Sequence, residues 1–194
     1  MRDLALLAAL IAYFGAALWI LHMAAGMIYR LFVKSIVPIP THRLVVEAVA
    51  KHLAAEFPDG RFAFVDIGSG EGIIAAALAK KFPAAGIVGI EHNPYCVLVA
   101  RVRAFLRRAK NVRFNRADMW SADVAALKPD VVYIYLGRRS TTKMGQKLLS
   151  ELPGKCRIIS NHFKISGAEP EKIIELDGSG LNTGLGPILV YRPR

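Results

Sequence analysis

The chain opens with a long apolar stretch and then alternates short apolar runs with amphipathic segments. From Leu4 to Tyr29, 26 consecutive residues lack Asp, Glu, Lys and Arg. About 20 apolar residues cross the hydrocarbon core of a bilayer, so the stretch predicts one transmembrane helix. A cleaved signal peptide and a core helix of a soluble protein are the alternatives. Arg30, Lys34 and Arg43 follow the stretch, which predicts that the remaining chain lies on the cytoplasmic side, or on the matrix side in an organelle.

Two prolines, Pro38 and Pro40, interrupt the chain after the apolar stretch. They stop a helix and hold the backbone extended. We expect Thr41 to cap a new helix from Arg43 to about Phe57. The pattern therefore divides the chain into a membrane anchor (1–34), a linker with an N-terminal helix (35–60) and a main domain (61–194).

In the main domain, short apolar runs rich in β-branched residues alternate with helical patterns. The predicted strands cover 62–67, 86–91, 112–115, 131–136 and 157–161, and the predicted helices cover 73–81, 94–109 and 141–152. Two last runs, 172–176 and 188–191, predict a terminal antiparallel pair. This order predicts an α/β fold with a mostly parallel sheet, in which ligands bind beyond the carboxyl ends of the strands.

Charge and cysteine content narrow the function classes. The net charge is +11, and the segment 101–116 contains seven Arg and Lys residues without an acid. Such a run suits RNA, anionic lipid headgroups or an acidic partner, and it also suits a solvated helix face. Cys96 and Cys156 have no neighbouring ligands at metal spacing, so we expect neither a zinc site nor a disulfide scaffold.

A glycine-rich loop joins the first strand to its helix, with Asp66 before it and glycines at Gly68, Gly70 and Gly72. Such a loop lets a ligand approach the backbone, although it also serves as a plain tight turn. Glu91 ends the second strand, where a carboxylate reaches the two hydroxyls of a bound ribose. The glycine spacing departs from the dinucleotide fingerprint, and Asp66 would repel a pyrophosphate. These features favour S-adenosylmethionine over a dinucleotide.

A third element follows the third predicted strand. Asp118 is placed to accept a hydrogen bond from an exocyclic amine such as that of adenine, and Met119 and Trp120 supply apolar surface for the ring. Asp118 as a solvated loop acid and Trp120 as a core residue are the alternatives. Asn93, just after the second strand, is either a ligand-site residue or only a helix cap.

These three elements, in this order, resemble class I S-adenosylmethionine-dependent methyltransferases. Together with 38–41 and 91–95, they are similar to the small membrane-anchored protein-lysine methyltransferases that modify the rotor-ring subunit of ATP synthase and the adenine nucleotide translocase. The resemblance covers about 38–161 and implies a Rossmann-like sheet, the cofactor S-adenosyl-L-methionine and a membrane protein with an accessible lysine as substrate. It implies a cofactor site lined by Pro40, Thr41, Asp66, Gly68, Ser69, Gly70, Glu91, Asn93, Asp118 and Met119.

The fourth predicted strand ends in two tyrosines, Tyr133 and Tyr135, which share a face. We predict that Tyr135, nearer the strand end, walls the lysine channel or holds the amine by a cation–π contact. The following stretch lacks the Asn/Asp-Pro-Pro-aromatic motif of enzymes that methylate base amines. Two alternatives stay open: an RNA methyltransferase that uses the basic 101–116 face, and a membrane module that binds S-adenosylmethionine without catalysis.

Overall fold

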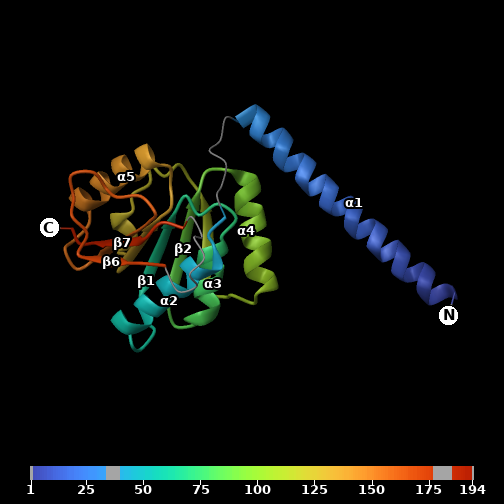
Figure 1. Cartoon of the computed structure of the whole chain (residues 1–194), viewed down its shortest axis with the longest axis horizontal. Coiled ribbons are helices and arrows are strands. Elements are labelled where there is room, and N and C mark those ends of the chain that lie inside the picture. The colour runs from blue at the N-terminus through green and yellow to red at the C-terminus, as the bar shows by residue number, and fades with distance from the viewer. Residues whose placement is uncertain (1, 34–39, 177–184, 194) are drawn as a thin grey trace. The chain divides into compact units, whose positions relative to one another are not determined.

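A computed structural model describes residues 2–33, 40–176 and 185–193. The chain forms two compact units, 1–38 and 39–194, each considered by itself. The first unit contains helix α1 (Arg2–Val33), shown in blue in Figure 1. Within it, Leu4–Met27 has a mean hydropathy of 2.4 and is not buried against other residues. The predicted helix is therefore confirmed, and its length and composition suffice to cross a membrane.

Within the described residues, the second unit contains a seven-stranded sheet in the order β3-β2-β1-β4-β5-β7-β6. The strands are β1 (Ala63–Ile67), β2 (Gly86–Glu91), β3 (Val112–Arg116), β4 (Val131–Ile134), β5 (Arg157–Asn161), β6 (Lys172–Ile174) and β7 (Ile188–Tyr191). Strands β1 to β5 are parallel, and β7 is antiparallel to both β5 and β6. The predicted mostly parallel sheet with an antiparallel terminal pair is confirmed.

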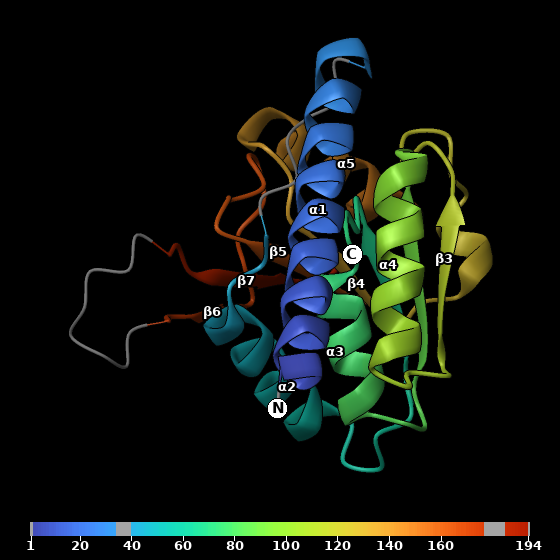
Figure 2. The ribbon, with the colours of Figure 1, turned by 90° about the vertical axis from the view of Figure 1, so that its right-hand side faces the viewer.

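Helices cover both faces of the sheet. One hydrophobic core packs α2 (Arg43–Glu56), α3 (Ile73–Lys81) and α4 (Pro94–Leu106) on one face. A second core packs α5 (Arg138–Glu151) and the segment around the short 3₁₀ helix η1 (Ala125–Leu127) on the other face. Helices α3 and α4 lie side by side in Figure 2. The fold therefore leaves the carboxyl ends of β1, β2, β4 and β5 at one edge.

Helix boundaries differ from the predicted ones for local reasons. Thr41 does not cap α2, because the Nδ1 atom of His42 accepts the hydrogen bond from the Leu44 N–H, at 3.2 Å. Helix α4 ends at Leu106, three residues early, since Arg108 adopts a left-handed conformation with φ 56°. A residue in this region cannot continue a right-handed helix.

The start of α5 and the end of β4 also move. Helix α5 begins at Arg138 and not at Thr141, because the Thr141 N–H already donates to the Gly137 carbonyl. The buried Thr141 hydroxyl donates to the Leu136 carbonyl at 3.0 Å, and this bond draws the chain out of the strand after Ile134. The basic segment 137–140 therefore forms the first turn of a helix.

Gly72 is required where the glycine-rich loop enters α3. Its φ is 70°, and a Cβ there would lie 2.6 Å from Cζ of Phe114 and 2.8 Å from Cβ of Ala100. Because strain and overpacking add, we expect Gly72→Ala to destabilise the protein by about 2–5 kcal/mol in urea unfolding. The control is Gly86→Ala, since nothing lies within 4 Å of its added Cβ. Equal stability of the two variants would contradict this packing.

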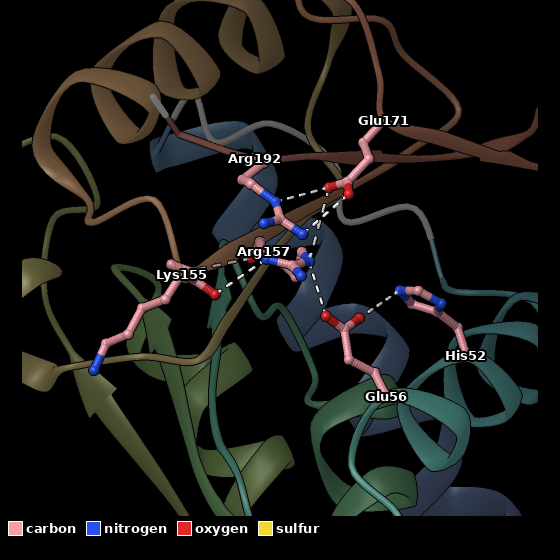
Figure 3. Close-up of polar contacts among 7 residues, drawn as sticks. His52, Glu56, Lys155, Arg157, Glu171 and Arg192 are labelled. Carbon is pink, nitrogen blue, oxygen red and sulfur yellow. Dashed lines mark hydrogen bonds and ion pairs between the residues drawn. The ribbon is translucent and has the colours of Figure 1, made fainter.

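A network of charged side chains ties α2 to the C-terminal strands at the amino end of β5 (Figure 3). The Nε atom of Arg157 lies 2.8 Å from Oε1 of Glu56 and 3.9 Å from Oε2 of Glu171. Arg192 donates two hydrogen bonds to Glu171, at 3.1 and 3.0 Å. His52 faces Glu56 with 3.2 Å between Nε2 and Oε2, yet burial lowers the pKa of its imidazole. The network joins helix and strands that are distant in sequence.

Arg157 is the central cation of this network, with only 16% of its side chain exposed. Replacing it with Met leaves the Glu56 carboxylate without its nearest cation. We expect Arg157→Met to lower the free energy of unfolding by about 1–3 kcal/mol. Arg43→Met is the control, because Arg43 is 85% exposed in its pair with Glu47, and we expect less than about 0.5 kcal/mol there. Equal losses would show that the network does not stabilise the fold.

Candidate functional site

Four polar side chains meet at the carboxyl edge of the sheet. Asp66 on β1 lies beside Tyr133 on β4, because the two residues are partners in the parallel register. Tyr133 is in turn the partner of Ile159 on β5. Residues two apart on a strand share a face, so Asn161 lies on the same face as Tyr133. Glu91 ends β2, the strand on the other side of β1.

The glycine-rich loop is fastened to the end of β2 by its backbone. The N–H groups of Gly68 and Ser69 both donate to the Ile90 carbonyl, at 2.9 and 3.0 Å. Gly68 and Gly70 have φ values of 71° and 52°. A Cβ on Gly68 would lie 2.7 Å from Cδ2 of Leu136. The conformation and the lack of space both require glycine at position 68.

Glu91 is buried, and backbone donors fix its carboxylate. The Gly70 N–H donates to Oε2 at 3.0 Å, and the Asn93 N–H donates to Oε1 at 2.9 Å. Nδ1 of His92 lies 3.1 Å from the same Oε1 atom. Because each carboxylate oxygen has a second lone pair, Glu91 can still accept hydrogen bonds from a ligand hydroxyl. The carboxylate is therefore oriented before any ligand arrives.

Asp66 is only 2% exposed, and its Oδ2 atom has no hydrogen-bond partner within the described residues. Burial, with a smaller contribution from the Glu91 charge, raises the pKa of Asp66 to about 8. The buried Oγ of Ser69 likewise has no partner there. Leaving such groups unpaired costs about 1–3 kcal/mol each. A ligand that carries a donor or a positive charge would satisfy the Asp66 carboxyl group.

The two tyrosines of β4 differ in burial. Tyr133 is fully buried, and its hydroxyl lies near Thr41 and Asn161 without hydrogen-bond geometry to any described residue. Burial raises the pKa of this hydroxyl, and the Asp66 charge adds to the rise. Tyr135 packs against the same core but is only half-buried. The role assigned to Tyr135 stays a prediction, and Tyr133 joins the site as a buried polar neighbour.

The remaining predicted cofactor residues occupy the rim of this edge. Asn93 is buried, and its Oδ1 caps α4 by accepting from the Tyr95 and Cys96 N–H groups. Asp118 is exposed, and its Oδ1 accepts from the Trp120 N–H at 3.1 Å. Met119 is half-buried against the second core. Pro40 is exposed and Thr41 half-buried, at the start of the second unit.

Two residues at the end of β5 escaped the sequence analysis. Asn161 is buried near Tyr133, and a polar residue at the end of a strand, as with Glu91, was the available signal. His162 has a φ of 71°, and its Nδ1 accepts from the Gly186 N–H at 2.8 Å. A non-glycine residue held in this region is typical of functional sites, and only the structure reveals it.

No group of three or more His, Cys, Asp and Glu side chains is arranged to hold a metal ion in the part of the chain that the structure describes. Both cysteines are buried thiols outside any disulfide. The chemistry at this edge therefore rests on two carboxyl groups, a glycine loop and hydroxyl and amide side chains. This set suits an organic ligand with hydroxyl groups and a positive charge.

Known proteins share this sequence and fold. The lysine N-methyltransferase of the ATP synthase C-type subunit from Mus musculus is 31% identical over 87% of this chain and 65% of its own length. The adenine nucleotide translocase lysine N-methyltransferase of Mus musculus is 29% identical over 57% of this chain and 47% of its own length. The chain thus spans about half to two thirds of the length of the curated relatives it matches.

A solved structure agrees with these relatives. The RNA methyltransferase from Salinibacter ruber in complex with S-adenosyl-L-homocysteine superposes with a TM-score of 0.67 and 26% identity, over 80% of this chain and 94% of that one. The seven-stranded sheet is the class I methyltransferase fold. The profile of the ANTKMT methyltransferase domain matches residues 66–172. Since that match covers more than half of the sequence, the chain belongs to the ANTKMT methyltransferase family.

Proposed function

We propose that this protein transfers a methyl group from S-adenosyl-L-methionine to the ε-amine of a lysine in a protein substrate. The observation that carries the proposal is the pairing of Asp66 and Glu91 on adjacent strand ends around the glycine loop. One carboxyl group is buried without a partner, and the other is oriented by backbone donors. The names of the relatives support lysine as the acceptor.

The residues at the strand ends fit this cofactor. Glu91 would accept from the two ribose hydroxyls, and Gly68 and Gly70 would let the ligand approach the backbone. Asp66 would face the positively charged methionine part, whose charge satisfies its buried oxygen. Asp118 and Met119 would bind the adenine amine and ring. Four further residues complete the proposed cofactor site: Pro40, Thr41, Ser69 and Asn93.

The bound cofactor supplies a methyl group on a positively charged sulfur, which a neutral amine displaces in line. The protein has to align the lysine nitrogen with the methyl carbon, and such alignment can supply ~7–11 kcal/mol. A lysine must first lose its proton, and exclusion of water lowers its pKa. We propose that the half-buried Tyr135 walls the lysine channel, where its ring also stabilises the amine.

We further propose that α1 anchors the protein in a membrane, with residues 39–194 on the cytoplasmic or matrix side, and that the substrate is itself a membrane protein. The support is the apolar segment Leu4–Met27 together with the relatives' names, which refer to a subunit of ATP synthase and to the adenine nucleotide translocase. Basic residues after α1 favour this orientation. An anchor would hold the enzyme in the plane of such a substrate.

RNA is the second candidate acceptor, because the Salinibacter ruber neighbour is an RNA methyltransferase and because 101–116 is basic. The test incubates the full-length protein and tritiated S-adenosylmethionine with membranes and cytosol of a strain that lacks the gene, followed by separate protease and nuclease digestion. We expect label in the membrane fraction that only protease releases. Label lost only to nuclease would establish the RNA alternative, and no label in any fraction would leave binding without catalysis.

A further inference from the structure

Helix α4 exposes apolar side chains that a soluble surface does not require. Four of them form what we call the α4 stripe: Leu98, Val102, Phe105 and Leu106, which are 60%, 49%, 81% and 74% exposed. Their spacing of four, three and one residues places them on one side of the helix. The opposite side of α4, with Val97 and Ala100, packs in the core. A contiguous apolar patch of this kind marks an interaction surface.

Basic side chains surround the α4 stripe. No Asp or Glu occurs from His92 to Ala117. Six cations of this segment are exposed and form no ion pair within the described residues: Arg101, Arg107, Arg108, Lys110, Arg113 and Arg116. Arg103 differs, because it is paired with Glu71 at 3.0 Å. The surface thus combines bulky apolar groups with uncompensated positive charge.

We propose that α4 docks on the surface of an anionic lipid bilayer, with the α4 stripe among the upper acyl chains and the surrounding cations on lipid phosphates. Amphipathic helices that lie in the bilayer interface have this combination of aliphatic and aromatic residues with arginine and lysine. RNA binding would use the cations but leave Leu98, Val102 and Leu106 in water. The lipid surface satisfies both halves of the patch.

The length of the chain between the two units supports this occupant. Nine residues separate Val33 at the end of α1 from Arg43 at the start of α2, and they reach at most roughly 35 Å. If α1 crosses the bilayer, a step that rests on the proposed function, the second unit always stays close to the lipid surface. Docking through α4 then occurs at a high effective concentration.

The test places a fluorescent probe on the α4 stripe of the full-length protein. Phe105→Cys is labelled with an environment-sensitive dye, while Cys96 and Cys156 are buried and label slowly. Ser150→Cys on α5, an exposed position on the other face of the sheet, is the matched control. The protein is reconstituted into vesicles of phosphatidylcholine alone or with 30% phosphatidylserine, each with nitroxide-labelled lipid as a quencher.

We expect a blue shift and lipid quenching at position 105 in anionic vesicles only, and neither change at position 150. Arg107→Gln and Arg108→Gln should each lower the docked-to-undocked ratio about fivefold. A position-105 probe that stays aqueous in vesicles that hold the protein overturns docking and leaves the anchor intact. A blue shift that persists in detergent, that depends on protein density or that requires RNA assigns the stripe to α1, to a second copy or to RNA. Protein that does not float with vesicles contradicts both docking and the anchor.

Discussion

Glu91→Gln is expected to weaken the binding of S-adenosylmethionine by about 100-fold or more. The substitution keeps the side-chain volume but turns its amide NH₂ toward the Gly70 or Asn93 N–H, which now donate to the carboxylate. It also weakens two proposed hydrogen bonds to ribose, and bonds to a charged group contribute about 1.5–3 kcal/mol each. Isothermal titration calorimetry of the full-length protein in detergent measures the loss.

The matched control for this variant is Glu47→Gln. Glu47 is an exposed acid on α2 that pairs with Arg43, away from the strand ends. We expect its affinity for S-adenosylmethionine to equal that of the wild-type protein. An unchanged affinity in Glu91→Gln, with the fold intact by circular dichroism, would remove the ribose role from Glu91.

Asp66→Asn is expected to stabilise the protein without ligand at alkaline pH. The pKa of Asp66 rises from 3.8 to about 8 in the fold, so the folded state holds this proton more tightly than the unfolded state. The wild-type protein therefore loses stability as the pH rises from about 4 to 8, and its slope is at most about 1.4 kcal/mol per pH unit. The asparagine variant lacks this loss. Urea unfolding of both proteins between pH 5 and 9 measures the difference.

The same carboxyl group makes ligand binding depend on pH. A positively charged ligand at Asp66 favours the carboxylate, so its binding releases a proton near neutral pH. We expect the affinity for S-adenosylmethionine to rise between pH 6 and 8 and to level off above about 8. Asp66→Asn should bind weakly and without this rise. Parallel stability curves for the two proteins, or a flat affinity profile in the wild type, would show that Asp66 is ionised before the ligand binds.

The sequence predicts those parts of the site whose residue types are demanded locally. The left-handed conformation at Gly68 and Gly70 and the close approach of Leu136 allow little else than glycine, so this loop was recognisable from its composition. Glu91 was recognisable because it ends an apolar strand at a fixed distance from the loop. The parallel order of the strands followed from the alternation of strand and helix patterns.

Other features depend on packing that no local pattern reveals. The apolar residues of α4 lie on all sides of the helix, and only the fold shows that Leu98, Phe105 and Leu106 face outward. Competing hydrogen bonds moved the helix starts, as at His42, which caps α2 in place of Thr41. The burial of Tyr133 beside Asn161 likewise arises from strands that are distant in the sequence.

The central claim is that the methyl group reaches a lysine nitrogen, and the most direct test identifies the methylated atom. Membranes from the strain without the gene are labelled by the full-length protein with tritiated S-adenosylmethionine, hydrolysed completely in acid and separated by amino-acid chromatography. We expect the label to elute with methylated lysines, and we expect Glu91→Gln to abolish it. Label that elutes with methylated nucleosides or with another amino acid would contradict lysine methylation by this protein.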